Sequence, residues 1–469
     1  MARPPENDRN DGARPPATGP WPARPTSRPL FAEPEPTPDP GTFKVKHTSD
    51  TASYHAIDEL NREHKLHPLP FPPPRGGAEP VLSLAKSLGG DEEAQKAIER
   101  ISARGKIVFH AGGDCGSTSG PKNQNQITDK LLGDFHESHP AELPQFALLL
   151  GDIVYSFGEA KYYYDQFYEP YRDYPAPILA AAGNHNGMLS PETHVASLDA
   201  YLRNFCADDF RVSPDALTLS RTAQVQPGVF FTLEAPFVRI LVLYSNMLED
   251  PGVIADNGEH IGDSQIRFLE EALSRVKREG FKGALLFAHH HPPYTASHGG
   301  SRHGGSPDML AQMDEVCRKT GVWPHAVLAG HAHNMQRFTR FRDDGTQIPY
   351  VTCGNMGHNV QSLSRKSSGT IRVPQIVQKA DRGQDQVVFE RYDDINYGYL
   401  RVVVTAKQLR IEYHAASDGP HVKSPDDSVT IDIATRKIAK FVAPDLGRPD
   451  DVLKARALRG RRHIAIDAI

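Results

Sequence analysis

The chain has 469 residues, of which 24% are charged, and its formal net charge is −5. This length allows one large domain with extensions, or two to three domains of roughly 100–200 residues each. A charge so near neutral argues against a nucleic-acid platform and against a surface for anionic membranes. No apolar run approaches the roughly 18–20 residues that cross a bilayer, so we expect no membrane span.

The four cysteines and the two ends of the chain limit its class further. The cysteines lack the CxxC spacing of a thiolate zinc site and the density of a disulfide framework. The N-terminus has no apolar core of the kind that a signal peptide needs, which indicates a cytoplasmic protein. We expect a disordered Pro-rich tail at 1–45, a helical and Pro-rich lead-in at 46–105, a main domain at 106–440 and a basic tail at 441–469.

After residue 105, short apolar runs alternate with amphipathic stretches, which is the pattern of an α/β domain. Five runs predict buried strands, at 107–109, 146–150, 178–182, 284–288 and 326–329. A helix is predicted at 263–280, with Asp263 as its N-cap and Gly280 at its end, and another begins at Asp91. The β-rich stretches 229–244 and 397–413 predict antiparallel hairpins.

Side chains that can bind a metal follow each of the five runs, in the segments HAGGDCG, LLLGDIVY, AAAGNHNG, FAHHHPPY and LAGHAH. In open α/β sheets, ligands bind beyond the carboxyl ends of strands, so we expect these segments to meet. Carboxylates, imidazoles and amide oxygens suit first-row metal ions, and a carboxylate can bridge two of them. Two neighbouring ions clamp a phosphoryl group and acidify a bound water. The segments supply Asp114, Asp152, Tyr155, Asn184, His290, His331 and His333.

Two further pairs of residues show that the same sequence spacing has different consequences in a strand and in a helix. In His331-Ala332-His333, an extended backbone would turn both rings to the same side, so that neighbouring ions take one ring each. Asp134 and His136 have the same spacing, but they lie in a segment that we predict to be helical, where they point apart. We therefore interpret Asp134 and His136 as surface residues.

In these five segments the chain resembles the calcineurin-like metallophosphoesterases, and within them the purple acid phosphatase branch. The segments match GDxG, GDxxY, GNH, a His-x-Pro-x-Tyr form of the fourth block, and GHxH, in that order. The resemblance implies an α/β fold, a four-layer α/β/β/α sandwich of two mixed sheets flanked by helices. It also implies that Asp152 bridges two metal ions, that Asp114, Tyr155 and His333 complete the first site, and that Asn184, His290 and His331 complete the second.

The first motif departs from the Asp-x-His form that many relatives have, because Gly116 stands where their histidine ligand would be. Tyr155, three residues after Asp152, can fill the vacant position, and a phenolate is a hard ligand that suits a trivalent ion. We therefore expect Fe(III) in the first site and Fe, Zn or Mn in the second. The alternative is that Tyr155 is an ordinary packed tyrosine.

The resemblance also implies roles for histidines that do not bind metal. His185 would contact the substrate phosphate and protonate the leaving oxygen. His298 would contact the phosphate from a glycine-rich loop, and His303 on the same loop competes for that role. The alternative is that these histidines have only structural, hydrogen-bonding roles.

Three other histidines are expected to lie outside the metal sites. Strand alternation predicts that His289 and His291 point away from the metal, although a register shift by one would make His289 the ligand. His358 is expected to be a turn residue. Asn186 follows His185 where an acidic residue is common in the branch, and residues 1–105 do not predict the N-terminal β-sandwich of plant-type enzymes.

Together these patterns predict a metal-dependent phosphoester hydrolase that acts on a small phosphoester. By resemblance we expect an acid-phosphatase-like monoesterase, in which a metal-bound hydroxide attacks phosphorus in line. One alternative is a phosphodiesterase that uses Mn or Zn. A second is a non-catalytic scaffold, which the complete set of ligand side chains disfavours.

Overall fold

The structure is a computed structural model. It describes residues 67–137, 139–189, 195–245, 252–256, 259–297, 303–363, 371–381, 384–417 and 424–443, with residues 23–32, 39, 41–43 and a few positions between 52 and 63. Most of both expected tails therefore lies outside the described residues.

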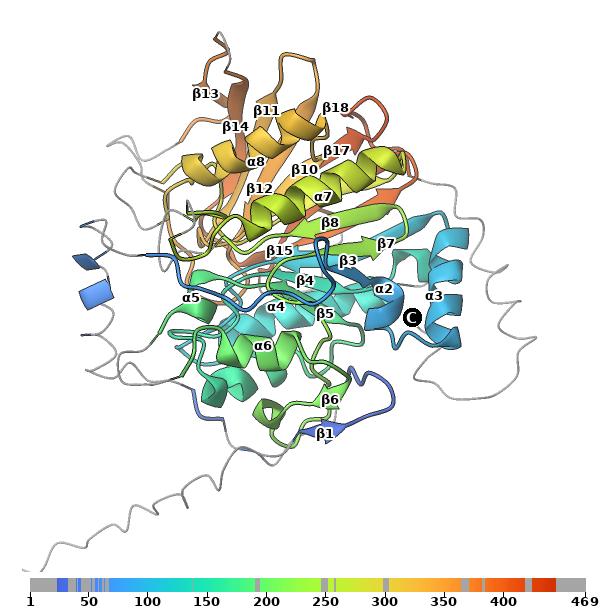
Figure 1. The fold of residues 1–469 in the computed structure, drawn as a ribbon, viewed down its shortest axis with the longest axis vertical. Helices are drawn as coiled ribbons and strands as arrows, with labels where there is room; N and C mark the ends of the chain where they lie inside the picture. The colour runs from blue at the N-terminus through green and yellow to red at the C-terminus, as the bar shows by residue number, and fades with distance from the viewer. Residues whose placement is uncertain are drawn as a thin grey trace, which may run out of the picture.

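Two mixed β-sheets form the centre of the fold (Figure 1). The first has nine strands in the order β13 (Gln375–Gln378), β14 (Gln386–Asp393), β11 (Met335–Phe341), β12 (Gln347–Cys353), β10 (Ala326–Ala329), β9 (Ala284–Ala288), β8 (Val238–Val242), β7 (Phe231–Ala235) and β2 (Val81–Ser83). The second has seven, in the order β18 (Lys437–Ile438), β17 (Asp427–Asp432), β16 (Gln408–Ala415), β15 (Gly398–Thr405), β3 (Lys106–Gly112), β4 (Ala147–Leu150) and β5 (Ile178–Ala181).

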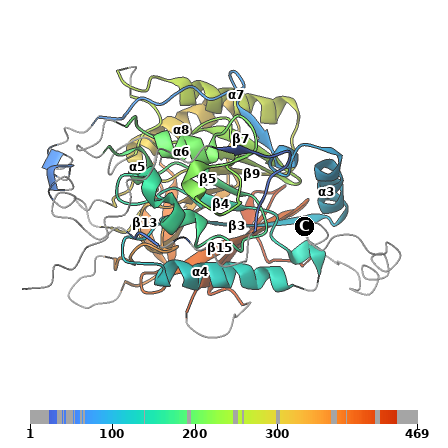
Figure 2. The same cartoon turned by 90° about the horizontal axis from the view of Figure 1, so that it is seen from below.

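Helices cover the outer faces of both sheets. Seen from below, α7 (Ser264–Arg278) and α8 (Pro307–Thr320) lie on one side of the sheets, and α4 (Lys122–Gly133) lies on the other (Figure 2). The remaining helices are α2 (Leu84–Ser87), α3 (Glu92–Ala103), α5 (Asn184–Gly187) and α6 (Asp199–Phe205), with short helical turns at 134–136, 140–142, 160–162, 164–168 and 214–216. The predicted four-layer sandwich is confirmed.

The core between the sheets explains why the short apolar runs form strands. Phe109, Leu148, Leu286 and Leu328 come from both sheets and are fully buried in one apolar cluster. Residues of a strand that is covered on both faces need no polar alternation, so each run is almost continuously apolar. All five predicted strands are present, and β3 pairs in parallel with β4 and β4 with β5, as β9 does with β10.

The predicted helices are also present, with one difference at a cap. Asp91 caps α3 by accepting a hydrogen bond from the Ala94 backbone at 2.9 Å. Asp263 occupies the N-cap position of α7, but its carboxylate pairs with Arg267 and makes no cap hydrogen bond. The predicted hairpins are β7–β8 and β15–β16.

Two sequence interpretations are wrong. Part of the expected N-terminal tail lies against the domain, because β1 (Arg24–Pro25) pairs with β6 (Arg211–Val212). Asp134 is not a surface residue: it is 3% exposed, and its carboxylate lies 2.9 Å from Nε2 of His110 on β3. The helix ends at residue 133, and the turn that follows carries Asp134 inward while His136 stays exposed.

Within the part of the chain that the structure describes, no helix combines the length and the apolar character needed to cross a membrane.

Candidate metal centre

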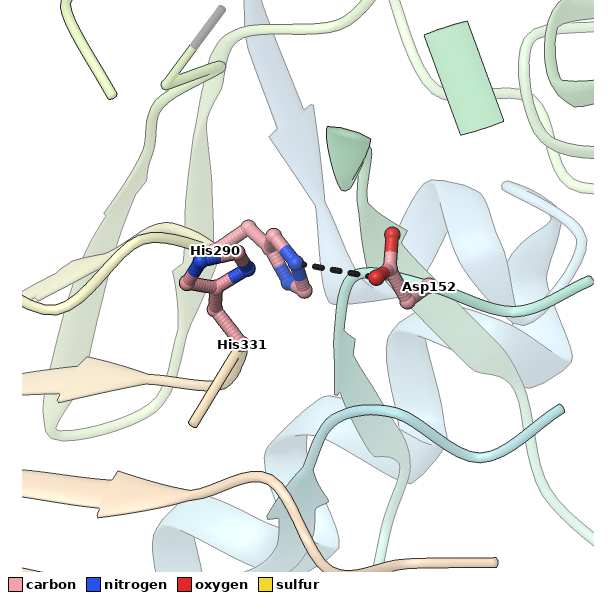
Figure 3. A group of neighbouring side chains, drawn as sticks. All are labelled: Asp152, His290 and His331. Carbon is pink, nitrogen blue, oxygen red and sulfur yellow. Dashed lines mark ion pairs between the residues drawn. The ribbon is translucent and has the colours of Figure 1, made fainter. Parts of the chain in front are cut away.

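The predicted ligands meet at one edge of the sandwich, as expected from the strand order. Asp114, Asp152 and Asn184 follow β3, β4 and β5 of the seven-stranded sheet, and His290 and His331 follow β9 and β10 of the other. In Figure 3 the His290 and His331 rings approach Asp152 from the opposite sheet. The centre thus forms only when both sheets are packed together.

The first donor set surrounds the phenol oxygen of Tyr155. This oxygen lies 3.0 Å from Oδ1 of Asp114, 3.2 Å from Oδ2 of Asp152 and 3.4 Å from Nε2 of His333. Tyr155 is 1% exposed, so its ring is buried and does not lie at the surface of the protein. The phenol oxygen therefore lies within reach of three side chains that can bind a metal ion.

The second donor set surrounds the amide oxygen of Asn184. This oxygen lies 2.9 Å from Nε2 of His290 and 3.2 Å from Nδ1 of His331. Nε2 of His290 also lies 3.2 Å from Oδ2 of Asp152. Ligand atoms of Asp152, His290 and His331 lie within 4.8 Å of one another, close enough to share one ion.

Oδ2 of Asp152 belongs to both donor sets, so the carboxylate stands where a bridging ligand would be. Asp114 and Asp152 are buried, and among the described residues neither carboxylate pairs with a lysine or an arginine. Buried carboxylates are stable only when they are compensated by cations or by hydrogen bonds. The charge and the mixed O and N donors therefore fit metal cations.

Local backbone geometry explains why glycines precede the ligands. A Cβ on Gly183 would lie 2.2 Å from Oδ1 of Asp152, and one on Gly151 would lie 2.3 Å from Nδ1 of His290. Asp114, Asp152 and His331 have φ values of 59°, 53° and 65°. Such left-handed conformations are unfavourable for residues other than glycine and cluster at functional sites.

Hydrogen bonds orient the histidine rings of the two sets. Nδ1 of His290 lies 2.7 Å from the Leu150 carbonyl oxygen, so Nε2 faces the donor set. Nδ1 of His333 lies 2.9 Å from Oδ1 of Asn359, which turns its Nε2 toward Tyr155. Sequence reasoning did not identify Asn359, because the GNMGHN segment carries no ligand signal of its own. Ring nitrogens held in this way are typical of metal-ligating histidines.

The carboxylates dominate the electrostatics of the centre. Burial opposes the charged form of His290, but Asp152 and Asp114 raise the pKa of its ring to about 9. Burial also opposes the charge on Asp152, yet His290 and His185 hold the pKa of its carboxyl well below the usual range. The site is therefore an anionic cradle that attracts cations.

His185 lies next to this cradle, at the first turn of α5. Its Nδ1 donates to the Ser156 carbonyl oxygen at 2.7 Å, and its Nε2 lies 3.9 Å from Oδ2 of Asp152. Its ring centroid is 4.3 Å from that of Tyr155. Burial lowers the pKa of His185. The position is compatible with a group that passes a proton to a substrate at the centre.

Asn186 is a buried hydrogen-bond acceptor between two loops of the centre. Its Oδ1 accepts hydrogen bonds from the backbone N–H of Asp152 at 3.0 Å and of Gly183 at 2.9 Å. One amide oxygen thus ties together the loops that carry Asp152 and Asn184. This role could not be derived from the sequence, because it depends on where the two loops meet.

Several histidines differ from their expected positions. His291 does not point away: its ring centroid is 4.2 Å from that of His331, because Ser245 holds its Nδ1 at 2.9 Å. His358 is more than a turn residue, since its ring stacks on Tyr155 with centroids 3.8 Å apart. His303 lies against the His331 ring at 4.9 Å, and at 4.8 Å from that of His333. His298 lies outside the described residues.

His331 and His333 lie near separate donor sets, as predicted, but the reason differs. Both rings lie against His303, so they share a side of the chain. The backbone between them is not an extended strand, because His331 has a left-handed conformation. A turn, not strand alternation, therefore brings the two rings together.

No protein-family model matches the chain, and no curated protein matches it either. Solved structures with a similar fold include a purple acid phosphatase from yellow lupin (Lupinus luteus) seeds, at 16% identity and a TM-score of 0.46, over 72% of this chain and 57% of the lupin enzyme. The chain thus spans little more than half of that enzyme's length.

Two other solved structures have a comparable likeness. PhoD is 12% identical with a TM-score of 0.45, over 75% of this chain and 76% of PhoD. GAP50, the anchor in the inner membrane complex of Plasmodium, is 11% identical with a TM-score of 0.43, over 76% of this chain and 95% of GAP50. At these identities and TM-scores, the likenesses assign no role to any residue.

Proposed function

We propose that the chain is a metal-dependent hydrolase of phosphate monoesters that holds two ions. The observation that carries the proposal is the position of Asp152, whose Oδ2 belongs to both an oxygen-rich donor set and a nitrogen-rich one. Asp114, Tyr155 and His333 would hold the first ion with Asp152, and Asn184, His290 and His331 would hold the second. Fe(III) suits the phenolate-containing set, and Fe, Zn or Mn suits the other.

Two ions held there would supply an acidified water and neutralise charge on the phosphoryl oxygens. The chain's own groups would complete the chemistry. With its Nδ1–H donated to Ser156, the doubly protonated ring of His185 would carry its second proton on Nε2 and pass that proton to the leaving oxygen. His303, beside His331 and His333, would contact the phosphate, and His298 is a second candidate for that contact.

The first experiment is element-resolved mass spectrometry of the purified chain. We expect close to two ions per chain, one of them iron. Two ions of manganese or zinc would retain the phosphoesterase and favour the phosphodiesterase alternative. A chain that takes up no metal on reconstitution would contradict the proposed centre.

The second experiment measures activity on p-nitrophenyl phosphate and on its bis ester. We expect the monoester to be hydrolysed faster, and faster turnover of the diester would refute the monoesterase proposal. Asp152→Asn should lower turnover by at least about a hundredfold, because it removes a charge from both donor sets. Asp343→Asn is the matched control, since Asp343 is exposed in the turn between β11 and β12.

A further inference from the structure

A cavity lies beside the candidate metal centre. It has a volume of about 460 Å³ and is bordered by the 157–161 loop, by α5 and the residues after it, and by the start of α6. None of the seven candidate ligands lines it. Its size is in the range of cavities that bind small organic molecules, roughly 300–1,000 Å³.

This cavity and the metal centre have α5 as a common wall. α5 carries Asn184 and His185 toward the centre, while Asn186 and the following Met188 line the cavity. The loop on the other side packs directly on α5, because a Cβ on Gly158 would lie 2.9 Å from the His185 carbonyl oxygen. A group that leaves from phosphorus next to His185 is therefore adjacent to the cavity.

The lining of the cavity favours an aromatic occupant. Phe157, Ala160, Met188 and Leu198 supply apolar surface. A phenylalanine ring and a methionine thioether both interact favourably with an aromatic ring, beyond the effect of burial. Ile57, from the lead-in segment, packs on Phe157 and Met188 and supports this wall from outside.

Two polar groups of the lining lack acceptors. Nδ2 of Asn186 is buried and has no hydrogen-bond partner, although Asn186 is only 3% exposed. Lys161 has no carboxylate partner among the described residues, and its ammonium lies 4.7 Å from the ring of its neighbour Tyr162. By contrast, Arg203 is already paired with Asp199 and Asp215. The lining also holds two carboxylates, but both are engaged: Asp199 pairs with Arg203, and Glu159 accepts a hydrogen bond from the Phe157 backbone N–H at 3.1 Å. The two unmatched groups are therefore donors, and one of them carries a positive charge.

We propose that this cavity binds the organic part of the substrate, and that the preferred substrates are phosphate monoesters of an aromatic alcohol that carries a carboxylate. The inference rests on the proposed function. Hydrolysis breaks the bond between phosphorus and the ester oxygen and forms a bond between phosphorus and a water oxygen. The leaving oxygen takes its proton from His185, and the proton of the water passes to solvent. The ring occupies the apolar walls, and its carboxylate meets Lys161.

The test compares kcat/KM for 4-carboxyphenyl phosphate, phenyl phosphate and methyl phosphate, measured as phosphate release by the metal-loaded chain. Lys161→Gln should lower the preference for 4-carboxyphenyl over phenyl phosphate by about fivefold, the value of one partly exposed ion pair. Ala160→Trp, which fills the cavity, should lower the preference for both aryl esters over methyl phosphate. Lys122→Gln is the matched control, because Lys122 is exposed and does not line the cavity, and it should change neither ratio.

Unchanged ratios in both cavity variants would overturn the inference and leave the proposed function intact. If the wild-type chain hydrolyses none of the three esters, the proposed function fails and the leaving-group role fails with it. Binding of 4-hydroxybenzoate, the released alcohol, by isothermal titration calorimetry is the independent readout. We expect Lys161→Gln and Ala160→Trp to weaken this binding, and equal affinity for all three chains would contradict the cavity as its site.

Discussion

Replacing Asn186 with alanine tests whether one amide holds the two ligand loops together. Oδ1 of Asn186 is the acceptor for the backbone N–H groups of Asp152 and Gly183, and the side chain is 3% exposed. Removal of the amide leaves two buried donors without a partner. An unsatisfied buried donor costs about 1–3 kcal/mol, so Asn186→Ala should lose about 2–6 kcal/mol of folding free energy.

The assay is urea unfolding followed by fluorescence and circular dichroism in parallel, because coincident curves are needed for a chain of this size. Metal content of the same variant should fall, since Asp152 loses the contact that fixes its backbone. Asn186→Asp is the matched control: it retains both acceptor contacts and should recover most of the lost stability. A loss of folding free energy below about 1 kcal/mol in Asn186→Ala, with unchanged metal content, would show that Asn186 does not hold the two ligand loops together.

Three further predictions concern other sites. Tyr155→Phe removes the phenol oxygen of the first donor set, so the iron-loaded variant should lack the visible phenolate-to-iron absorption band that we expect of the wild-type chain; an identical spectrum would exclude Tyr155 as a ligand. Burial and then Arg436 lower the pKa of His325 to about 3, from 6.5, so the unfolded chain binds this proton first. The contribution of His325 to the free energy of unfolding should be fully present above pH 6.5 and should fall by up to about 4 kcal/mol toward pH 3. Urea unfolding should therefore show a weaker pH dependence for His325→Gln than for the wild-type chain. Asp134→Ala should lose about 3 kcal/mol in the same assay, because it leaves the buried His110 without its carboxylate partner; a loss below about 1 kcal/mol would show that this pair contributes little.

The strands and the candidate ligands can be predicted from the amino-acid sequence alone. Buried strands need apolar residues on both faces, and the turns that follow them need glycine next to a polar side chain, so both signals are local. Asp114, Asp152 and His331 could be found in this way. The rule that the carboxyl ends of parallel strands share one edge of a sheet brings Asp114 and Asp152 together. The approach of His331 from the other sheet depends on how the two sheets pack.

The directions of the neighbouring side chains depend instead on how distant parts of the chain pack together. His291 lies beside His331 because Ser245, from the end of another strand, holds its ring, and Asp134 is buried because His110 is opposite it. His358 stacks on Tyr155 although more than 200 positions separate them in the chain. Such contacts join elements that are distant in sequence, and their energy is gained only after both sheets have packed. No local pattern of residues records them.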